Sequence, residues 1–162
     1  ANASPDYGRF PATGWMFFVE AGFYSHRALW MLIFAGVFER YPRLHIGTVE
    51  QELSWIPHFL DRIDYTYTQR ARRAYWQRFK GNALPSDFFH QNVFCSFQED
   101  ALGIRDRYVI GVDNLMWGSD YPHQESTWPK SREILERILK EVPEGEKAKI
   151  AGENVARLYH VD

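Results

Sequence analysis

Three short apolar segments alternate with longer stretches of helical periodicity, and this alternation constrains the fold more than any other feature. The segments are residues 43–49, residues 92–97 and the run that begins at Leu115. Strands that alternate with helices form parallel βα units, because each helix returns the chain to the same end of the sheet. The sequence therefore predicts an α/β fold with a parallel sheet.

Helical spacing of apolar residues fills most of the sequence between these strands. The predicted helices cover residues 15–41 with a break near Gly22, 53–79, 84–89, 100–109 with a break at Gly103, 130–142 and 143–159. Residues 1–14 contain two prolines and two glycines and are predicted to form an irregular loop.

The length and the apolar content favour one cored domain. The chain has 162 residues, of which 45% are hydrophobic. Three strands are few for a parallel sheet buried on both faces, because the outer strands would leave apolar edges uncovered. We therefore expect residues 1–162 to be a single, partial domain.

The nearly balanced charge of the chain argues against a polyanionic partner. The chain has 19 basic and 21 acidic residues, a net charge of -2. Neither a nucleic acid nor an anionic membrane is expected as a partner, and the arginines within 70–78 are interpreted as a solvated helix face. A small-molecule substrate is expected instead. The single cysteine, Cys95, fits a reducing compartment, so the cytoplasm is the expected location.

Polar side chains stand where each predicted strand ends. Glu50 and Gln51 follow the first strand, Ser96 and Gln98 end the second, and Asp120 follows the third. The carboxyl ends of parallel strands meet at one edge, where α/β proteins place their active sites. A carboxylate pair there needs a cation, a proton or an arginine, and a divalent metal ion is the simplest partner. The segment around Asp120 also suits an ordinary turn.

The histidines give a weaker signal. His123 follows Asp120 by three residues and could reach the same site, or it could be a hydrogen-bonded turn residue. Three others are predicted to lie on helices, without the paired ligand at i, i+4 that a local metal site would need: His26, His58 and His90. There is no Gly-rich phosphate loop, no G-x-S-x-G motif and no paired CxxC.

Five separated motifs together resemble the amidohydrolase-related family. These metal-dependent barrel enzymes include aminocarboxymuconate-semialdehyde decarboxylase and related hydrolases. The motifs occur in family order: AGVFERYPRLHIGTVEQ (35–51), a helix opening with Trp55 and Pro57, LPSDFFHQNVFCSF (84–97), LMWGSDYPHQES (115–126) and GENVARLY (152–159).

The resemblance implies a TIM-like (β/α)8 barrel, of which this chain would supply the C-terminal part, about strands six to eight. A whole barrel needs about 250 residues. The first-strand histidine pair and the fifth-strand histidine of the family are absent here. The implied function, for a larger parent enzyme, is that of a metal-dependent hydrolase or decarboxylase acting on a small carbonyl or carboxylate compound. The implied cofactor is a divalent metal ion, with zinc as the expectation.

The same resemblance assigns roles to individual residues. Asp120 matches the eighth-strand aspartate, which ligates the metal and acts on the attacking water. Glu50 occupies the place where many relatives carry the sixth-strand histidine, and as a second catalytic residue it could ligate metal, move a proton or hold substrate. Apart from the resemblance, the positions of Gln51, Trp117 and His123 near the strand ends make them the expected substrate-binding residues.

The missing histidines motivate an alternative from a different class. The chain could be a catalytically inactive, truncated fragment that acts as a structural or partner-dependent interaction module. Both interpretations predict association, either as a homo-oligomer or with the N-terminal half of the barrel. A small flavodoxin-like domain is disfavoured, because no phosphate-binding loop follows any predicted strand.

Overall fold

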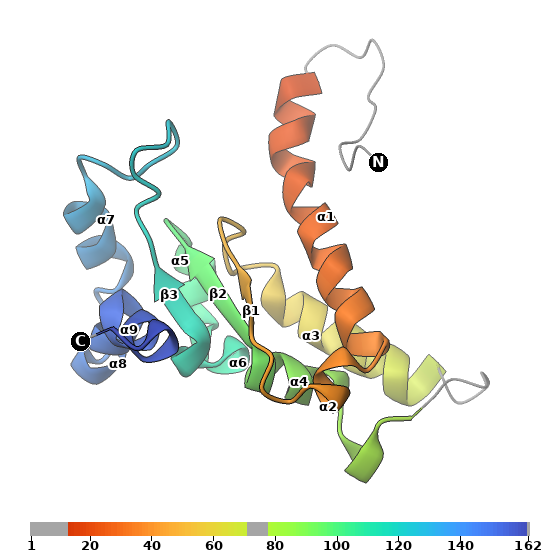
Figure 1. Cartoon of the computed structure of the whole chain (residues 1–162). Coiled ribbons are helices and arrows are strands. Elements are labelled where there is room, and N and C mark those ends of the chain that lie inside the picture. The colour runs from red at the N-terminus through yellow and green to blue at the C-terminus, as the bar shows by residue number, and fades with distance from the viewer. Residues whose placement is uncertain (1–12, 71–77, 162) are drawn as a thin grey trace.

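The computed structural model describes residues 13–70 and 78–161, which form a parallel three-stranded sheet flanked by helices (Figure 1). The strands are β1 (Ile46–Thr48), β2 (Val93–Phe97) and β3 (Leu115–Trp117), in the order β1-β2-β3. Thr48 lies opposite Cys95 and Phe97 lies opposite Trp117, so all three strands end at one edge. The predicted α/β fold with a parallel sheet is confirmed.

Most of the described chain outside the sheet is helical. In chain order the elements are α1 (Thr13–Phe34), α2 (Val37–Arg40), α3 (Ile56–Tyr65), the π-helical turn η1 (Thr66–Arg70), the 3-10 turn η3 (Lys80–Asn82), α4 (Pro85–Asn92), α5 (Ala101–Arg105), α6 (Arg107–Ile110), the 3-10 turn η4 (Val112–Asn114), α7 (Ser131–Ile138), α8 (Glu144–Ala148), the π-helical turn η5 (Lys149–Glu153) and α9 (Asn154–Tyr159).

Two predicted helix breaks were placed wrongly. The first long helix is continuous through Gly22 and breaks at Gly36, whose φ of 67° ends the α-helical path. The second break falls at Asp106 and not at Gly103, which lies inside α5. Gly103 is needed for close packing, because a Cβ there would overlap the Cβ of Leu53. A glycine therefore marked a close approach of two segments and not a break.

Several boundaries also differ from the prediction. The first strand is shorter than residues 43–49, and the helix expected from residue 53 begins at Ile56. The last helix contains the π-helical turn η5. The predicted loop at 1–14 lies outside the described residues apart from Thr13 and Gly14, which open α1, and residues 71–77 of the second helix also lie outside them.

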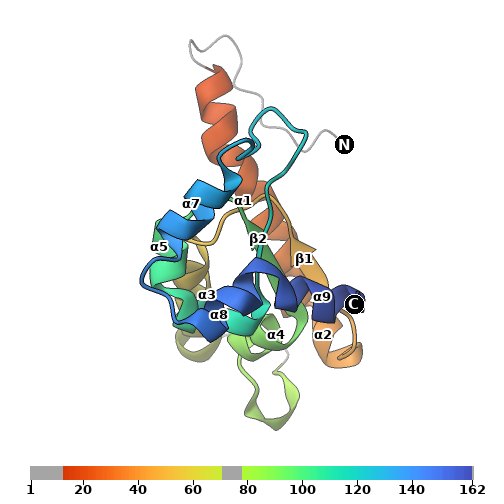
Figure 2. The ribbon, with the colours of Figure 1, turned by 90° about the vertical axis from the view of Figure 1, so that its left-hand side faces the viewer.

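The core lies between the sheet and the helices on one of its sides. Figures 1 and 2 together place α3 and α5 on the same side of β2. Along β2, Val93, Cys95 and Phe97 are buried in this core, while Phe94 and Ser96 on the other face are half-buried. Burial raises the pKa of the Cys95 thiol to about 12, which keeps it protonated. The face of β2 that points away from the core, with Phe94 and Ser96, is thus only partly covered in the described residues.

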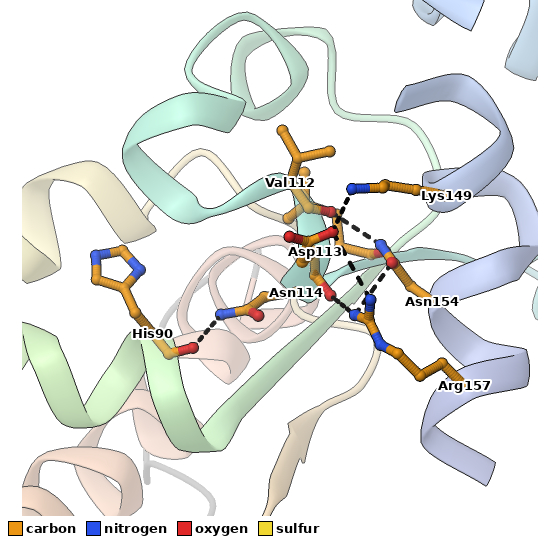
Figure 3. A network of polar contacts seen from close by, with 8 residues as sticks. His90, Val112, Asp113, Asn114, Lys149, Asn154 and Arg157 are labelled. Atoms are coloured by element: carbon orange, nitrogen blue, oxygen red, sulfur yellow. Dashed lines mark hydrogen bonds and ion pairs between the residues drawn. The ribbon is translucent and has the colours of Figure 1, made fainter. Parts of the chain in front are cut away.

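The GENVARLY motif fastens the C-terminal helices to the turn before β3 (Figure 3). The Nδ2 atom of Asn154 donates to the carbonyl oxygens of Val112 and Leu115, at 2.8 Å each, and Asn154 is fully buried. Arg157 donates to the Asp113 carbonyl at 2.7 Å, and Lys149, which precedes the motif, pairs with the Asp113 carboxylate at 2.8 Å. The motif therefore has a structural role at the start of β3.

Helix α1 presents an apolar surface to solvent. Its exposed side chains include Trp15, Val19, Phe23 and Met31, and Figure 1 shows its N-terminal half standing clear of the sheet. In the described residues, β1 and β3 each pair with β2 alone. Over the same residues, no helix combines the length and apolar character needed to cross a membrane.

Candidate active site

A cleft of ≈ 820 Å³ lies at the carboxyl ends of the strands. Four segments that are far apart in the sequence line it: α1, the loop after β1, the end of β2 and the loop after β3. The lining residues are Val19, Gly22, Phe23, His26, Glu50, Gln51, Glu52, Ser54, Trp55, Gln98, Asp120, His123, Gln124 and Glu125.

The structure brings five of the residues singled out in the sequence into this one cleft: Glu50, Gln51, Gln98, Asp120 and His123. Ser96 lies further back, within β2, with its Oγ near Gly118. Trp117 is not among the side chains that line the described cleft. It packs against the core, and its Nε1 donates to the Gln98 carbonyl at 3.0 Å. A substrate-binding role for Trp117 stays a prediction.

Three carboxylate residues of the cleft have left-handed backbone conformations. The φ angles are 57° at Glu50, 52° at Glu52 and 58° at Asp120. This region costs a non-glycine residue roughly 1 kcal/mol or more, and such residues concentrate at active sites and ligand clamps, where the surroundings impose them. The strain therefore coincides with the residues that carry charge into the cleft.

Asp100 fixes the loop after β1 in place. Its Oδ2 accepts hydrogen bonds from the backbone N–H groups of Leu53 at 2.8 Å and Ser54 at 2.6 Å, and its Oδ1 accepts one from Gly103 at 2.8 Å. Asp100 is buried. The loop that carries Glu50 and Trp55 is therefore tied to the first turn of α5. No local sequence pattern gives the contacts of Asp100 with Leu53 and Ser54, because these residues lie on a loop far earlier in the chain.

Glu50 and Asp120 meet across the cleft. A side-chain hydrogen bond with Asp120 raises the pKa of Glu50, and the negative charge of Asp120 raises it further. Two carboxyl groups so close share a proton or require a cation. The pair joins the ends of β1 and β3, as the strand-end reasoning expects.

His123 lies beside Asp120. Its Nδ1 is 2.8 Å from Oδ2 of Asp120, and its backbone N–H donates to the Asp120 carbonyl at 2.8 Å. The Nδ1 and Oδ2 atoms are close but do not form a hydrogen bond, and Oδ2 of Asp120 is a buried oxygen without a hydrogen-bond partner. This oxygen is therefore available to a ligand.

Unpartnered buried polar atoms are concentrated in this cleft. Of the five such side-chain atoms in the described residues, four belong to its lining: Nε2 of His26, Oε1 of Gln51, Oε2 of Glu52 and Oδ2 of Asp120. Burial is also the main cause that raises the pKa of Glu52. Native proteins rarely leave buried polar groups unpaired, so this concentration indicates a place for a bound group.

His26 is the residue that the sequence reasoning missed. It lies on α1, is 7% exposed and stacks on Trp55, with ring centroids 3.6 Å apart and an interplanar angle of 18°. Burial lowers the pKa of His26 to about 4, so the imidazole is neutral at pH 7. No local pattern gives this contact, because Trp55 belongs to the loop beyond the next strand.

The described residues can supply only part of the ligand shell of a divalent metal ion. The buried, unpartnered oxygen of Asp120 is a suitable hard ligand. A positive charge there would also relieve its repulsion with Glu50. Within residues 13–70 and 78–161, however, no group of three or more His, Cys, Asp or Glu side chains is arranged to hold a metal ion.

This architecture, with its carboxylates at the strand ends, agrees with a comparison to known families. The amidohydrolase family matches residues 7–161, so the chain belongs to the amidohydrolase family. The resemblance inferred from the five motifs is confirmed. No match was found among curated proteins.

The solved structures that resemble this chain include several decarboxylases. A 5-carboxyvanillate decarboxylase from Sphingomonas paucimobilis has 28% identity and a TM-score of 0.72 over 99% of this chain and 45% of that chain. A 2,6-dihydroxybenzoate decarboxylase from Rhizobium has 21% identity and a TM-score of 0.71, over 98% and 48%. A 5-carboxyvanillate decarboxylase from Novosphingobium aromaticivorans, complexed with manganese, has 25% identity and a TM-score of 0.66, over 90% and 40%.

These comparisons define the class of protein more firmly than its chemistry. The chain spans less than half the length of each of these relatives. The metal named for the Novosphingobium enzyme is manganese and not the expected zinc. The family assignment is therefore established, whereas the activity, substrate and metal of this chain belong to the proposal that follows.

Proposed function

We propose that this chain is the C-terminal part of a (β/α)8 barrel that decarboxylates a hydroxylated aromatic acid with the help of a divalent metal ion. The observation that carries the proposal is the contact between Asp120 and Glu50 at the carboxyl ends of parallel strands, inside a ≈ 820 Å³ cleft. The 28% identity to a 5-carboxyvanillate decarboxylase supports decarboxylation as the reaction.

Asp120 is the residue of this chain that would hold the metal ion, through its buried Oδ2. When bound, the ion supplies a positive charge that stabilises both carboxylates and polarises a substrate oxygen. Manganese is our first choice, because the Novosphingobium relative contains it. Zinc is the alternative.

Glu50 is the proposed proton donor. Decarboxylation of an aromatic acid requires a proton on the ring carbon that bears the carboxylate. The bond from that carbon to the carboxylate then breaks, CO2 leaves and its electron pair restores the aromatic ring. The neighbouring Asp120 favours the protonated form of Glu50, so this carboxyl can deliver the proton and recover one from solvent. The balance is one aromatic carboxylate and one proton giving one arene and one CO2.

Hydrolysis is the second candidate. The observation that favours it is the 2.8 Å approach of His123 Nδ1 to Asp120 Oδ2, because such a pair can accept a proton from an attacking water. Both reactions use the same edge of the sheet, and the position of the scissile bond in the cleft decides between them.

We further propose that the preceding half of the barrel covers the apolar side of α1 and the free edge of β1. The relatives contain more than half of their length outside the matched region, and the exposed side chains of α1 need a partner to be buried. The alternative is a catalytically inactive fragment that acts only as a structural or partner-dependent interaction module, and both proposals predict a complex.

The test combines metal analysis with a product assay on the native protein, together with any chain that accompanies it. We expect CO2 release from hydroxylated benzoates in the presence of manganese. Asp120→Ala should lose at least about 1000-fold in kcat/KM and most of the bound metal. As a control, Asp61→Ala on the exposed side of α3 should change neither. Unchanged metal content and turnover in the Asp120 variant would refute the assignment.

A further inference from the structure

We propose that His26 and Gln51 bind a neutral hydrogen-bonding group of the substrate, such as a ring hydroxyl, in a niche above Gly22. This inference rests on the proposed function, because it assigns a substituent on the aromatic substrate of the same cleft. It gives these two residues a role in choosing the substrate, separate from the chemistry at Asp120.

The niche is defined by two atoms that approach the same glycine. A Cβ built on Gly22 would lie 3.2 Å from Oε1 of Gln51 and 3.7 Å from Nε2 of His26. Both atoms are buried, and neither has a hydrogen-bond partner. Gly22, His26 and Gln51 all line the cleft, so a bound group can reach this space from it. It then finds a ring nitrogen on one side and an amide on the other.

The imidazole is held rigidly for this purpose. Trp55 stacks on one face of His26, and Phe23 meets its ring edge-on with centroids 5.8 Å apart. The Nε1 atom of Trp55 in turn donates to the Glu52 carbonyl at 3.1 Å. A preorganised ring loses little conformational freedom when it forms a hydrogen bond, which favours binding.

The charges around the niche select for a neutral group. Burial keeps the pKa of His26 near 4, so the ring brings no positive charge at pH 7. The described lining contains four acidic residues and no lysine or arginine; the acidic residues are Glu50, Glu52, Asp120 and Glu125. A second carboxylate on the substrate would be repelled there. A hydroxyl can both donate and accept, so it matches an imidazole and an amide together.

The rival explanation is that His26 is only a packing residue. In that case rotation of the Gln51 amide would join it to the His26 nitrogen, and the pair would hold α1 against the loop after β1. Substitution would then alter stability, and the preference among substrates would not change.

Two variants separate these explanations. His26→Phe keeps an aromatic ring against Trp55 and removes the nitrogen. Gly22→Ala fills the niche, and it should fold well because alanine is the better helix former inside α1. His58→Phe, at an exposed position of α3, is the matched control.

The assay compares kcat/KM for a dihydroxylated aromatic acid and for the analogue that lacks one hydroxyl. We expect the wild-type enzyme and His58→Phe to favour the dihydroxylated acid. In His26→Phe and Gly22→Ala this preference should fall about 10-fold or more, with metal content unchanged. A preference that stays the same in both variants would overturn the inference while leaving the proposed decarboxylation intact.

A second experiment measures binding and does not depend on catalysis. Calorimetry measures the affinity for resorcinol, a neutral diphenol, in wild-type protein and in His26→Phe. A loss of affinity of about 10-fold supports the niche even if no decarboxylation is found, in which case only the proposed function fails. Equal affinity in the two proteins contradicts the niche.

Discussion

His26 shows how a single residue can take its properties from contacts that are distant in sequence. On a helix exposed to solvent it would be an ordinary histidine with a pKa near 6.5. Stacked on Trp55 and buried in the cleft, it stays neutral down to about pH 4. Desolvation disfavours the charged form, and no carboxylate compensates enough to restore it.

The depressed pKa of His26 predicts a specific dependence of stability on pH. Between about pH 6.5 and pH 4 the unfolded chain binds a proton at this residue and the folded chain does not. Acidification therefore favours unfolding, and the loss ends below pH 4. From pH 7 to pH 5 the free energy of unfolding should fall by about 2 kcal/mol more in the wild type than in His26→Phe.

Urea titrations of both proteins at several pH values measure this difference. Burial raises the pKa of Glu52, so acidification stabilises the fold at that residue in both proteins. The difference between the two proteins is therefore the test, because it cancels this opposite contribution. Parallel curves for the two proteins from pH 7 to pH 4 would show that His26 does not titrate as expected.

At the scale of elements, the turn before β3 decides where Asp120 is placed. Helices η5 and α9 are held to this turn through Asn154, Lys149 and Arg157 (Figure 3). On the opposite side of the cleft, Asp100 ties the loop after β1 to α5. None of these hydrogen bonds involves Glu50 or Asp120. Each set instead holds a segment next to the strand after which one of these two residues lies.

Asn154→Ala should therefore destabilise the fold markedly. It leaves the part-buried carbonyl of Val112 and the buried carbonyl of Leu115 without their amide donor, which costs about 2–4 kcal/mol in total. Thermal unfolding measures the loss. Arg157→Ala is the control, since this side chain is largely exposed and its loss should cost about 1 kcal/mol or less. Equal effects of the two substitutions would contradict a special role for the buried amide.

At the scale of the whole molecule, the apolar side of α1 and the outer edges of the sheet are uncovered in the described residues. Met31 is 64% exposed and Phe34 is 45% exposed on the same helix. Monomeric proteins rarely leave such groups of large apolar side chains uncovered. The proposed partner is the preceding half of the barrel, which would also bring further groups to the metal.

The double variant Met31→Lys and Phe34→Lys should weaken this association. Charged side chains on the buried face would lose the apolar contact and add a desolvation cost. Size-exclusion chromatography with light scattering should show a smaller species than the wild type. Leu102→Lys, an exposed apolar position on α5, serves as the control and should leave the mass unchanged. The same mass for all three proteins would argue against α1 as the interface.

The sequence by itself determined the class of fold, the edge at which the candidate site lies and two of the four acidic residues of its cleft, Glu50 and Asp120. Alternation of strands and helices is a local pattern, and the carboxyl ends of parallel strands necessarily share an edge. Glu50, Gln51 and Asp120 could therefore be placed together from the order of residues alone. The five motifs were also sufficient to indicate the family.

Only the tertiary structure decided which side chains complete the cleft. His26 and Gly22 lie on a helix whose own spacing carries no sign of a site, and Gly103 suggested a break where it permits the approach of Leu53. These contacts depend on how helices dock on the sheet, which is set by packing between residues far apart in the chain. The pKa of Glu50 likewise depends on its contact with Asp120 across that same packing.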